Sequence, residues 1–199
     1  MTAHFPWAWF MTGVALFAAG WLHRWRPAEQ VDQRVFLVLH RWLRRAVWFF
    51  KALWPVGTMA GMLLAAGVAA ILRGWQFGVL MLVVYGVITQ GEMLIKRTLT
   101  RQRPFQVLPA AQMGQPREPH DASFPSGDAL RVWLIACVLG AWLPAPWCGL
   151  LASVATLVSL GRIALGVHFP LDVIGGAGLG LVAAALVVWL GELLPVFLR

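Results

Sequence analysis

A histidine, an arginine and an aspartate lie close together between two apolar stretches in the C-terminal part of the sequence. They are Arg162, His168 and Asp172. A histidine can act as a nucleophile or carry a proton, an aspartate can orient its ring, and an arginine can hold two phosphate oxygens at once. This combination at the edge of a membrane segment indicates phosphate chemistry.

Two earlier clusters supply further parts of such a site. The first is a cationic run at the end of an apolar stretch, comprising Lys96, Arg97, Arg101 and Arg103. The second is Ser126-Gly127, which opens the next apolar stretch. A helix that begins there would offer free backbone N–H groups and its positive dipole end to an anion. The three clusters together predict a phosphoryl-transfer site.

The first two clusters resemble signature motifs of the type 2 phosphatidic acid phosphatases, also called the PAP2 or lipid phosphate phosphatase family. The first motif is a lysine followed after six residues by Arg-Pro, and Lys96 with Arg103-Pro104 matches it fully. The second motif is Pro-Ser-Gly-His. Residues 125–127 match its first three positions, but Asp128 stands where the family has histidine.

The third cluster resembles the remaining motif of this family. That motif is Ser-Arg, followed after five residues by histidine and after three more by aspartate. Arg162, His168 and Asp172 match it, and Gly161 replaces the serine. Three motifs in the right order make the resemblance specific over residues 96–172.

The resemblance implies a membrane lipid phosphatase that needs no metal and no other cofactor. His168 would attack phosphorus and form a phosphohistidine, and Asp172 would orient the histidine. The nonbridging phosphate oxygens would be held by Lys96, Arg103, Ser126, Gly127 and Arg162.

The aspartate in the second motif affects the expected substrate. In the family the histidine at this position protonates the leaving group and later activates water. Here Asp128 would take that role. His120 or Asp121 from the preceding loop could take it instead, although these two are more simply explained as solvated loop residues. An ordinary aspartate is ionised at neutral pH and is a poor acid.

A lipid phosphate that leaves from a diphosphate needs less protonation than a lipid alkoxide does. We therefore expect a diphosphate substrate such as undecaprenyl diphosphate, ahead of phosphatidylglycerol phosphate or phosphatidate. Two other activities remain open: transfer of the phosphoryl group to another lipid, and binding of lipid phosphates with weak catalysis. The retained motif residues favour the hydrolase.

Two further charged residues have structural as well as functional interpretations. Glu92 lies four positions before Lys96, so it can pair with that lysine on one helix face or act in the site. Arg131 lies about one helical turn after Asp128, so a local ion pair competes with phosphate binding as its role.

The composition independently indicates a membrane protein. Of the 199 residues, 60% are hydrophobic and 12% are charged, and the mean hydropathy is +0.73. The net charge is +8, and the cations flank apolar stretches. Lipid head groups and substrate phosphates are therefore the expected partners, rather than nucleic acid, and no obligate protein partner is evident.

The apolar stretches predict an all-α membrane bundle that forms a single domain over residues 1–199, with the site in a core of about 90–175. A basic amphipathic helix is expected at 34–54, in the membrane interface. Six spans are predicted, at residues 5–22, 58–72, 77–95, 128–143, 147–165 and 172–194. Six spans place all three motifs on one side of the bilayer.

The expected location is a bacterial-type inner membrane. The family usually faces its site away from the cytoplasm, and we take that orientation. The cations of the segment 24–51 lie on the site side, however, and the positive-inside rule would place them in the cytoplasm. The orientation is therefore open at this point.

Overall fold

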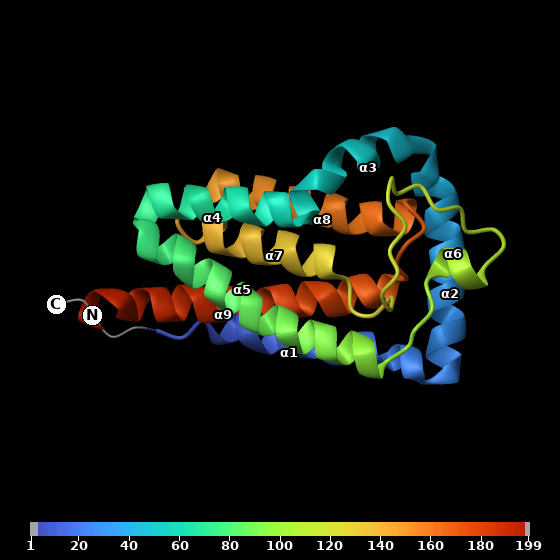
Figure 1. Cartoon of the computed structure of the whole chain (residues 1–199), viewed down its shortest axis with the longest axis horizontal. Coiled ribbons are helices and arrows are strands. Elements are labelled where there is room, and N and C mark those ends of the chain that lie inside the picture. Colours follow the sequence, from blue (N-terminus) through green and yellow to red (C-terminus); the bar gives the residue numbers. More distant parts are fainter. Residues whose placement is uncertain (1–3, 198–199) are drawn as a thin grey trace.

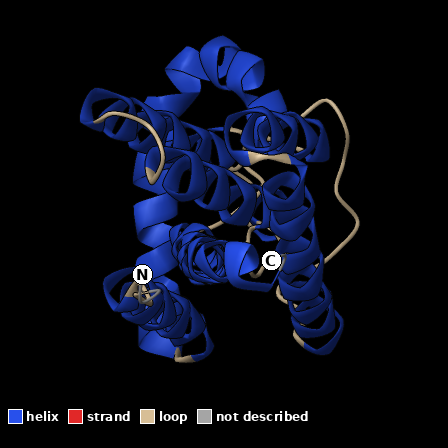
Figure 2. Cartoon of the chain, turned by 90° about the vertical axis from the view of Figure 1, so that its left-hand side faces the viewer, coloured by secondary structure: helices blue, strands red, loops and turns tan. Residues whose placement is uncertain are grey.

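The computed structural model describes residues 4–197, so both ends of the predicted 1–199 domain lie outside the described residues. Within this range the chain forms helices joined by turns and loops, with no strand, as the sequence predicts (Figure 2). The helices are α1 (Trp7–Gly20), η1 (Trp21–Arg24), α2 (Arg26–Leu43), η2 (Arg44–Ala46), α3 (Val47–Leu53), η3 (Trp54–Gly57), α4 (Met59–Arg73), α5 (Trp75–Thr98), α6 (Pro104–Val107), α7 (Gly127–Gly140), α8 (Ala145–Ala164) and α9 (Pro170–Phe197).

The long helices run roughly along one axis and form a bundle (Figure 1). Helix α9 packs against α1 on one side and against α7 on another. Met62, Met81, Leu134 and Val187, from four different helices, are completely buried in one apolar cluster. A Cβ on Gly178 of α9 would lie 2.5 Å from the carbonyl oxygen of Gly13, so glycine permits the close approach of α1.

Among the described residues, three helices are long and apolar enough to cross a membrane: Trp75–Thr98, Ala145–Ala164 and Pro170–Leu193. The bent pair Arg26–Gly57 and Met59–Arg73 forms a fourth candidate if it is one broken span. Helices α1, α4 and α7 occupy predicted spans but have 14, 15 and 14 residues. They are about 21 Å long, against about 30 Å of hydrocarbon. The protein is therefore a multi-pass membrane protein, and its count of six spans stays a prediction.

The segment predicted as one amphipathic helix at 34–54 is divided. Helix α2 starts earlier, at Arg26, because Pro27 favours the first turn of a helix, and it ends at Leu43, before the 3-10 turn η2. It crosses one end of the bundle (Figure 1). Its inward face buries Asp32, Phe36 and His40, which are spaced four residues apart. Its placement in a membrane interface stays a prediction.

The long connection between α5 and α7 covers the same end of the bundle. Its prolines limit helix formation to the single turn α6. Two backbone hydrogen bonds fix its path: Ser123 N–H donates to the Arg101 carbonyl at 2.8 Å, and Gly114 N–H donates to the Leu165 carbonyl at 2.9 Å. The ends of α5, α7, α8 and α9 therefore meet beneath this loop.

Candidate functional site

A cavity of about 350 Å³ lies where the three motifs meet. Its lining includes Lys96 and Arg103 from the first motif, Asp128 from the second, and Arg162 and His168 from the third. The fold thus brings together residues that are up to 72 positions apart in the sequence. Residues of the covering loop, including Gln115 and Asp121, complete the lining.

His168 lies in the short turn between α8 and α9. Gly166 has a φ of +73°, a left-handed conformation that glycine adopts readily, and it lets the chain reverse after α8. The Nε2 atom of His168 is 3.2 Å from an Nη atom of Arg103, whereas Nδ1 faces Asp172 at 3.7 Å. One ring nitrogen therefore points to a cation of the cavity, and the other points to a buried carboxylate.

The environment of His168 keeps its ring neutral. Its side chain is almost completely buried, and burial together with the positive charge of Arg103 lowers its pKa to about 3. The 3.7 Å separation from Asp172 is too long for a hydrogen bond, and Nδ1 has no hydrogen-bond partner among the described residues. A neutral imidazole keeps a lone pair on one nitrogen, which nucleophilic attack requires.

Asp172 is fixed by several donors in the first turn of α9. Its carboxylate accepts hydrogen bonds from the Ser123 hydroxyl at 2.5 Å and from the Phe169 N–H at 2.8 Å. It also pairs with Arg101 at 2.5 Å. The N-terminal end of a helix favours negative charge there. The carboxylate is therefore held rigidly beside His168.

Arg101 and Asp32 extend this network. The sequence placed Arg101 in the cationic run of the predicted site but indicated no role for Asp32. Arg101 pairs with Asp32 at 2.6 Å through its second terminal nitrogen. The other oxygen of Asp32 accepts a hydrogen bond from the Leu171 N–H at 3.0 Å. Both side chains are buried. The available signal was an acidic residue just before the predicted amphipathic segment 34–54, but nothing local indicated its partner.

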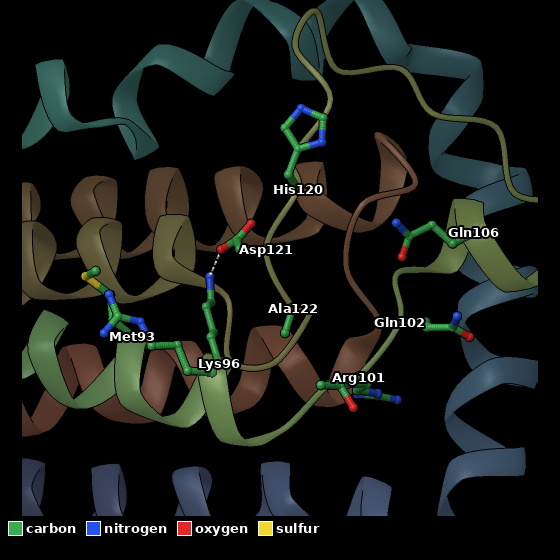
Figure 3. A pocket seen from close by; sticks show the side chains of 10 residues that line it. Met93, Lys96, Arg101, Gln102, Gln106, His120, Asp121 and Ala122 are labelled. Carbon is green, nitrogen blue, oxygen red and sulfur yellow. Dashed lines mark hydrogen bonds and ion pairs between the residues drawn. The ribbon is translucent and has the colours of Figure 1, made fainter.

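Asp121 lies between two cations of the first motif. Its carboxylate contacts the Lys96 ammonium at 2.7 Å and the Arg103 guanidinium at 2.8 Å (Figure 3 draws the first contact). Although burial opposes the charge, these two cations lower the pKa of Asp121 to about 2. Lys96 also pairs with Glu92 at 2.9 Å, as their spacing predicts. A carboxylate thus occupies a place between two cations that a phosphate would also favour.

Asp128 is held by two guanidinium groups. It contacts Arg162 at 2.9 Å and also pairs with Arg131, one turn along α7. Arg131 in addition donates to the Tyr85 hydroxyl at 2.9 Å, and Arg162 donates to the Gln115 side chain at 2.5 Å. Two arginines at these distances favour the ionised form of the carboxylate. Asp128 is thus held as a carboxylate between two cations.

The predicted phosphate ligands differ in their access to the cavity. Lys96, Arg103, Gly127 and Arg162 line it. The Nε atom of Arg162 is buried with no hydrogen-bond partner among the described residues, so it can bind an anion. Ser126 is absent from the lining. Its hydroxyl caps α7 by accepting from the Ala129 N–H at 3.5 Å.

The structure also places the three remaining candidates from the helices and the covering loop. Glu92 and Arg131 line the cavity, each in the ion pair described above. His120 lies outside this cavity and lines a neighbouring pocket (Figure 3). The cavity therefore combines a neutral histidine with four cationic side chains, partly neutralised by three carboxylates. This arrangement suits a tetrahedral anion that can compete with those carboxylates.

Comparison with known sequences supports this description. The sequence profile of the PAP2 superfamily matches residues 73–194, which contain all three motifs. The chain is 41% identical over 86 residues to an undecaprenyl-diphosphatase of Sulfolobus acidocaldarius, covering 43% of this chain and 41% of the relative. It is 36% identical over 96 residues to a decaprenylphosphoryl-5-phosphoribose phosphatase of Mycobacterium tuberculosis, covering 47% of this chain and 50% of the relative. The matches thus span about half or less of these curated relatives.

Solved structures resemble more of the chain. A PAP2-type phosphatidylglycerolphosphate phosphatase from Bacillus subtilis superposes with a TM-score of 0.70 at 25% identity, covering 94% of this chain and 96% of that one. Aquifex aeolicus LpxE superposes with a TM-score of 0.67 at 27% identity, covering 76% and 93%. Since the profile matches well over half of the sequence and the fold is shared along nearly all of it, this chain belongs to the PAP2 superfamily.

Proposed function

We propose that the protein is a membrane lipid phosphatase that hydrolyses a lipid diphosphate through a phosphohistidine on His168. The observation that carries this proposal is the position of the neutral His168 ring, whose Nε2 atom faces a cationic cavity and whose Nδ1 atom faces Asp172. A nucleophile, a group that orients it and the cations that bind phosphate are thus assembled in one site.

In the first step, the Nε2 lone pair attacks the terminal phosphorus. The bond between this phosphorus and the leaving oxygen breaks, and the leaving lipid phosphate takes the electron pair. The imidazole becomes positively charged, and Asp172 stabilises that charge through the Nδ1 side of the ring. The products of this step are the phosphohistidine and a lipid monophosphate.

The cations hold the transferred group during this step. Lys96, Arg103 and Arg162 approach the cavity from three different elements, so they can contact different nonbridging oxygens. Preorganised positive charge in a buried site stabilises the charge of a phosphoryl transition state. The substrate would displace the Asp121 carboxylate from Lys96 and Arg103, because both anions bind the same donors.

In the second step, water attacks the phosphohistidine. Asp128 accepts the proton of this water, the phosphorus–nitrogen bond breaks, and inorganic phosphate and neutral His168 are released. An ionised carboxylate between Arg131 and Arg162 can accept a proton from water, although the two guanidinium groups weaken it as a base. It does not suit protonation of an alkoxide leaving group, which favours a diphosphate substrate.

The names of the sequence relatives agree with a prenyl-type lipid. One is called an undecaprenyl-diphosphatase and another acts, by its name, on a decaprenylphosphoryl lipid. Our preferred substrate is therefore undecaprenyl diphosphate. Phosphatidylglycerol phosphate is the second candidate, because the structural relative with the broader coverage is called a phosphatidylglycerolphosphate phosphatase.

The test measures phosphate release by the purified protein in detergent from undecaprenyl diphosphate, phosphatidylglycerol phosphate and phosphatidate. We expect the diphosphate to be hydrolysed fastest, with no release by His168→Ala. Asp128→Asn should still form the phosphoenzyme in a single turnover but should release phosphate at least about 100-fold more slowly. Arg117→Ala, an exposed arginine of the covering loop, is the control and should retain full activity.

Three outcomes would contradict the proposal. Faster hydrolysis of phosphatidate would refute the diphosphate preference. Full activity of His168→Ala would refute the phosphohistidine. Transfer of labelled phosphate to an added lipid alcohol in place of release to water would identify a phosphotransferase.

We also propose that the site opens to the non-cytoplasmic face of a bacterial inner membrane. Arg117 lies in the loop at the site end, whereas Cys148 lies near the start of α8, at the other end of the bundle. In a cysteine-free variant, Arg117→Cys should react with an impermeant maleimide added to intact cells. A variant whose single cysteine is Cys148 should react with this maleimide only after the cells are lysed. The reverse pattern would place the site in the cytoplasm.

A further inference from the structure

A second pocket lies beside the candidate site and has no assigned role. It has a volume of about 710 Å³, and its lining comes from the end of α5 and from two segments of the covering loop, around Gln102 and around Asp121 (Figure 3). The polar residues that line it, apart from those it shares with the site, include Arg97, Thr100, Gln102, Gln106 and His120.

The two cavities share a wall. Lys96 and Asp121 line both of them, and the 2.7 Å ion pair between these residues lies at the boundary. The Lys96 ammonium has three N–H donors, so it can contact anionic oxygens on both sides. The Asp121 side chain is 51% exposed, so it can move aside.

The pocket offers hydrogen-bond donors that the protein leaves unused. The side chains of Arg97, Gln102 and His120 form no hydrogen bond or ion pair with the described part of the chain. Gln106 uses its carbonyl oxygen to accept from the Arg103 N–H at 2.8 Å, which leaves its amide N–H groups available. Arg101, by contrast, already binds two carboxylates.

The charges indicate what the pocket binds. Arg97 is a cation without a carboxylate partner among the described residues, and Lys96 gains donors if Asp121 moves. The unpaired guanidinium of Arg97 beside uncharged hydrogen-bond donors suits an anion of low negative charge with several oxygen atoms, such as a phosphate that is linked to other groups through two of its oxygens. The Met93 side chain at the pocket edge is partly exposed and can contact an apolar chain.

We propose that this pocket binds the second, non-scissile phosphate of the substrate, which lies between the scissile phosphate and the lipid. The inference rests on the proposed phosphatase function and names its substrate class as lipids with two linked phosphates. The two phosphates of a diphosphate share one bridging oxygen, so they must occupy neighbouring places. A scissile phosphate at His168 and a second phosphate near Arg97 would both contact Lys96. After cleavage, Arg97 would stabilise the charge of the leaving phosphate.

The experiment compares farnesyl diphosphate with farnesyl monophosphate, which have the same chain but differ in the second phosphate. Phosphate release by the wild type and by Arg97→Ala is measured in detergent. We expect kcat/KM of Arg97→Ala to fall about tenfold for the diphosphate, the effect of one charge-assisted contact, and to stay within about twofold for the monophosphate. The matched control is Arg117→Ala, which removes an exposed arginine of the covering loop that lines neither cavity and should change neither value.

The outcomes separate this inference from the proposed function. An equal loss for both substrates, or no loss for either, would overturn the second-phosphate pocket while leaving the phosphatase intact. If the wild type releases no phosphate from either compound, the proposed function fails. In that case, and also when only the diphosphate is hydrolysed, the pocket is tested by calorimetric titration of the same two compounds into His168→Asn and into His168→Asn with Arg97→Ala. Binding of the diphosphate weakened about tenfold by Arg97→Ala supports the pocket, and unchanged binding overturns it.

Discussion

The substitution Asp32→Asn tests whether a residue of the crossing helix α2 controls the Asp172 carboxylate, the proposed orienting group of His168. Asp32 contacts Arg101 at 2.6 Å, and Arg101 contacts Asp172 at 2.5 Å, with all three side chains nearly or completely buried. Asparagine retains the size of the side chain and the acceptor for Leu171 N–H. It replaces the charged oxygen that faces Arg101 by a neutral amide.

The size of the effect follows from this arrangement. Breaking a buried ion pair costs about 3–5 kcal/mol when a charge is left without compensation. Here Asp172 still compensates Arg101, so the loss should be near the value of one hydrogen bond to a charged group, about 2 kcal/mol. For a chain of this size, that corresponds to a decrease in Tm of about 4–8 °C.

The effect on catalysis should be separate from the effect on stability. Arg101 without Asp32 can rotate and draw Asp172 away from the His168 ring. A displacement of a fraction of an ångström should lower kcat about tenfold. The KM should change little, because the cations that line the phosphate cavity remain in place.

The assay measures thermal unfolding in detergent and steady-state phosphate release for the wild type and Asp32→Asn. Glu29→Gln is the control, since Glu29 is an acid of the same helix with no ion pair among the described residues. A Tm and a kcat equal to those of the wild type would refute the role of Asp32. A similar fall in kcat for Glu29→Gln would show a general charge effect instead.

Three further predictions concern the cavity. First, the lowered pKa of His168 means that below about pH 6.5 the unfolded chain binds a proton that the folded histidine does not bind until about pH 3, so stability falls as the pH falls. Between about pH 6.5 and about pH 5 the free energy of unfolding should fall by up to about 2 kcal/mol. Over this range Tm should fall less in His168→Asn than in the wild type. An equal fall in both proteins would contradict the lowered pKa of His168. Second, Asp121→Asn removes a carboxylate that would compete with phosphate for Lys96 and Arg103, so inorganic phosphate should inhibit this variant about two- to fivefold more strongly than the wild type. A large fall in kcat would instead indicate that Asp121 carries a proton. Third, a Cβ at Gly127 would lie 2.6 Å from a carboxylate oxygen of Glu92, so Gly127→Ala should raise KM about tenfold with little change in Tm. The control is Gly67→Ala, where the added atom meets nothing within 4 Å. An unchanged KM for Gly127→Ala would refute the steric argument.

The sequence determined the features that depend on local order. Apolar runs of helical length predicted the helices of the bundle, because a helix in lipid satisfies its own backbone hydrogen bonds. Each predicted span contains a helix in the structure, although only three or four meet the length and composition of a membrane span. The order of the motifs along these helices was enough to place Lys96, Arg103, Arg162 and His168 at one end of the bundle.

Pairs within one helix could also be predicted. Glu92 and Lys96 are four residues apart, and Asp128 and Arg131 are three apart, so the helical repeat places each pair on one face. Both ion pairs are present. What spacing could not decide was whether Asp128 would also meet Arg162, which lies on a different helix.

Only the tertiary structure decided the partners that come from distant elements. Asp32 and Arg101 are 69 positions apart, and Arg101 and Asp172 are 71 apart. Their contact depends on how α2 crosses the bundle, which face it turns inward and how the covering loop runs. The same loop path places Asp121 between two cations but His120 in the neighbouring pocket. Helical periodicity fixes which residues share a face, whereas the rotation of each helix and the course of a loop result from packing of the whole chain.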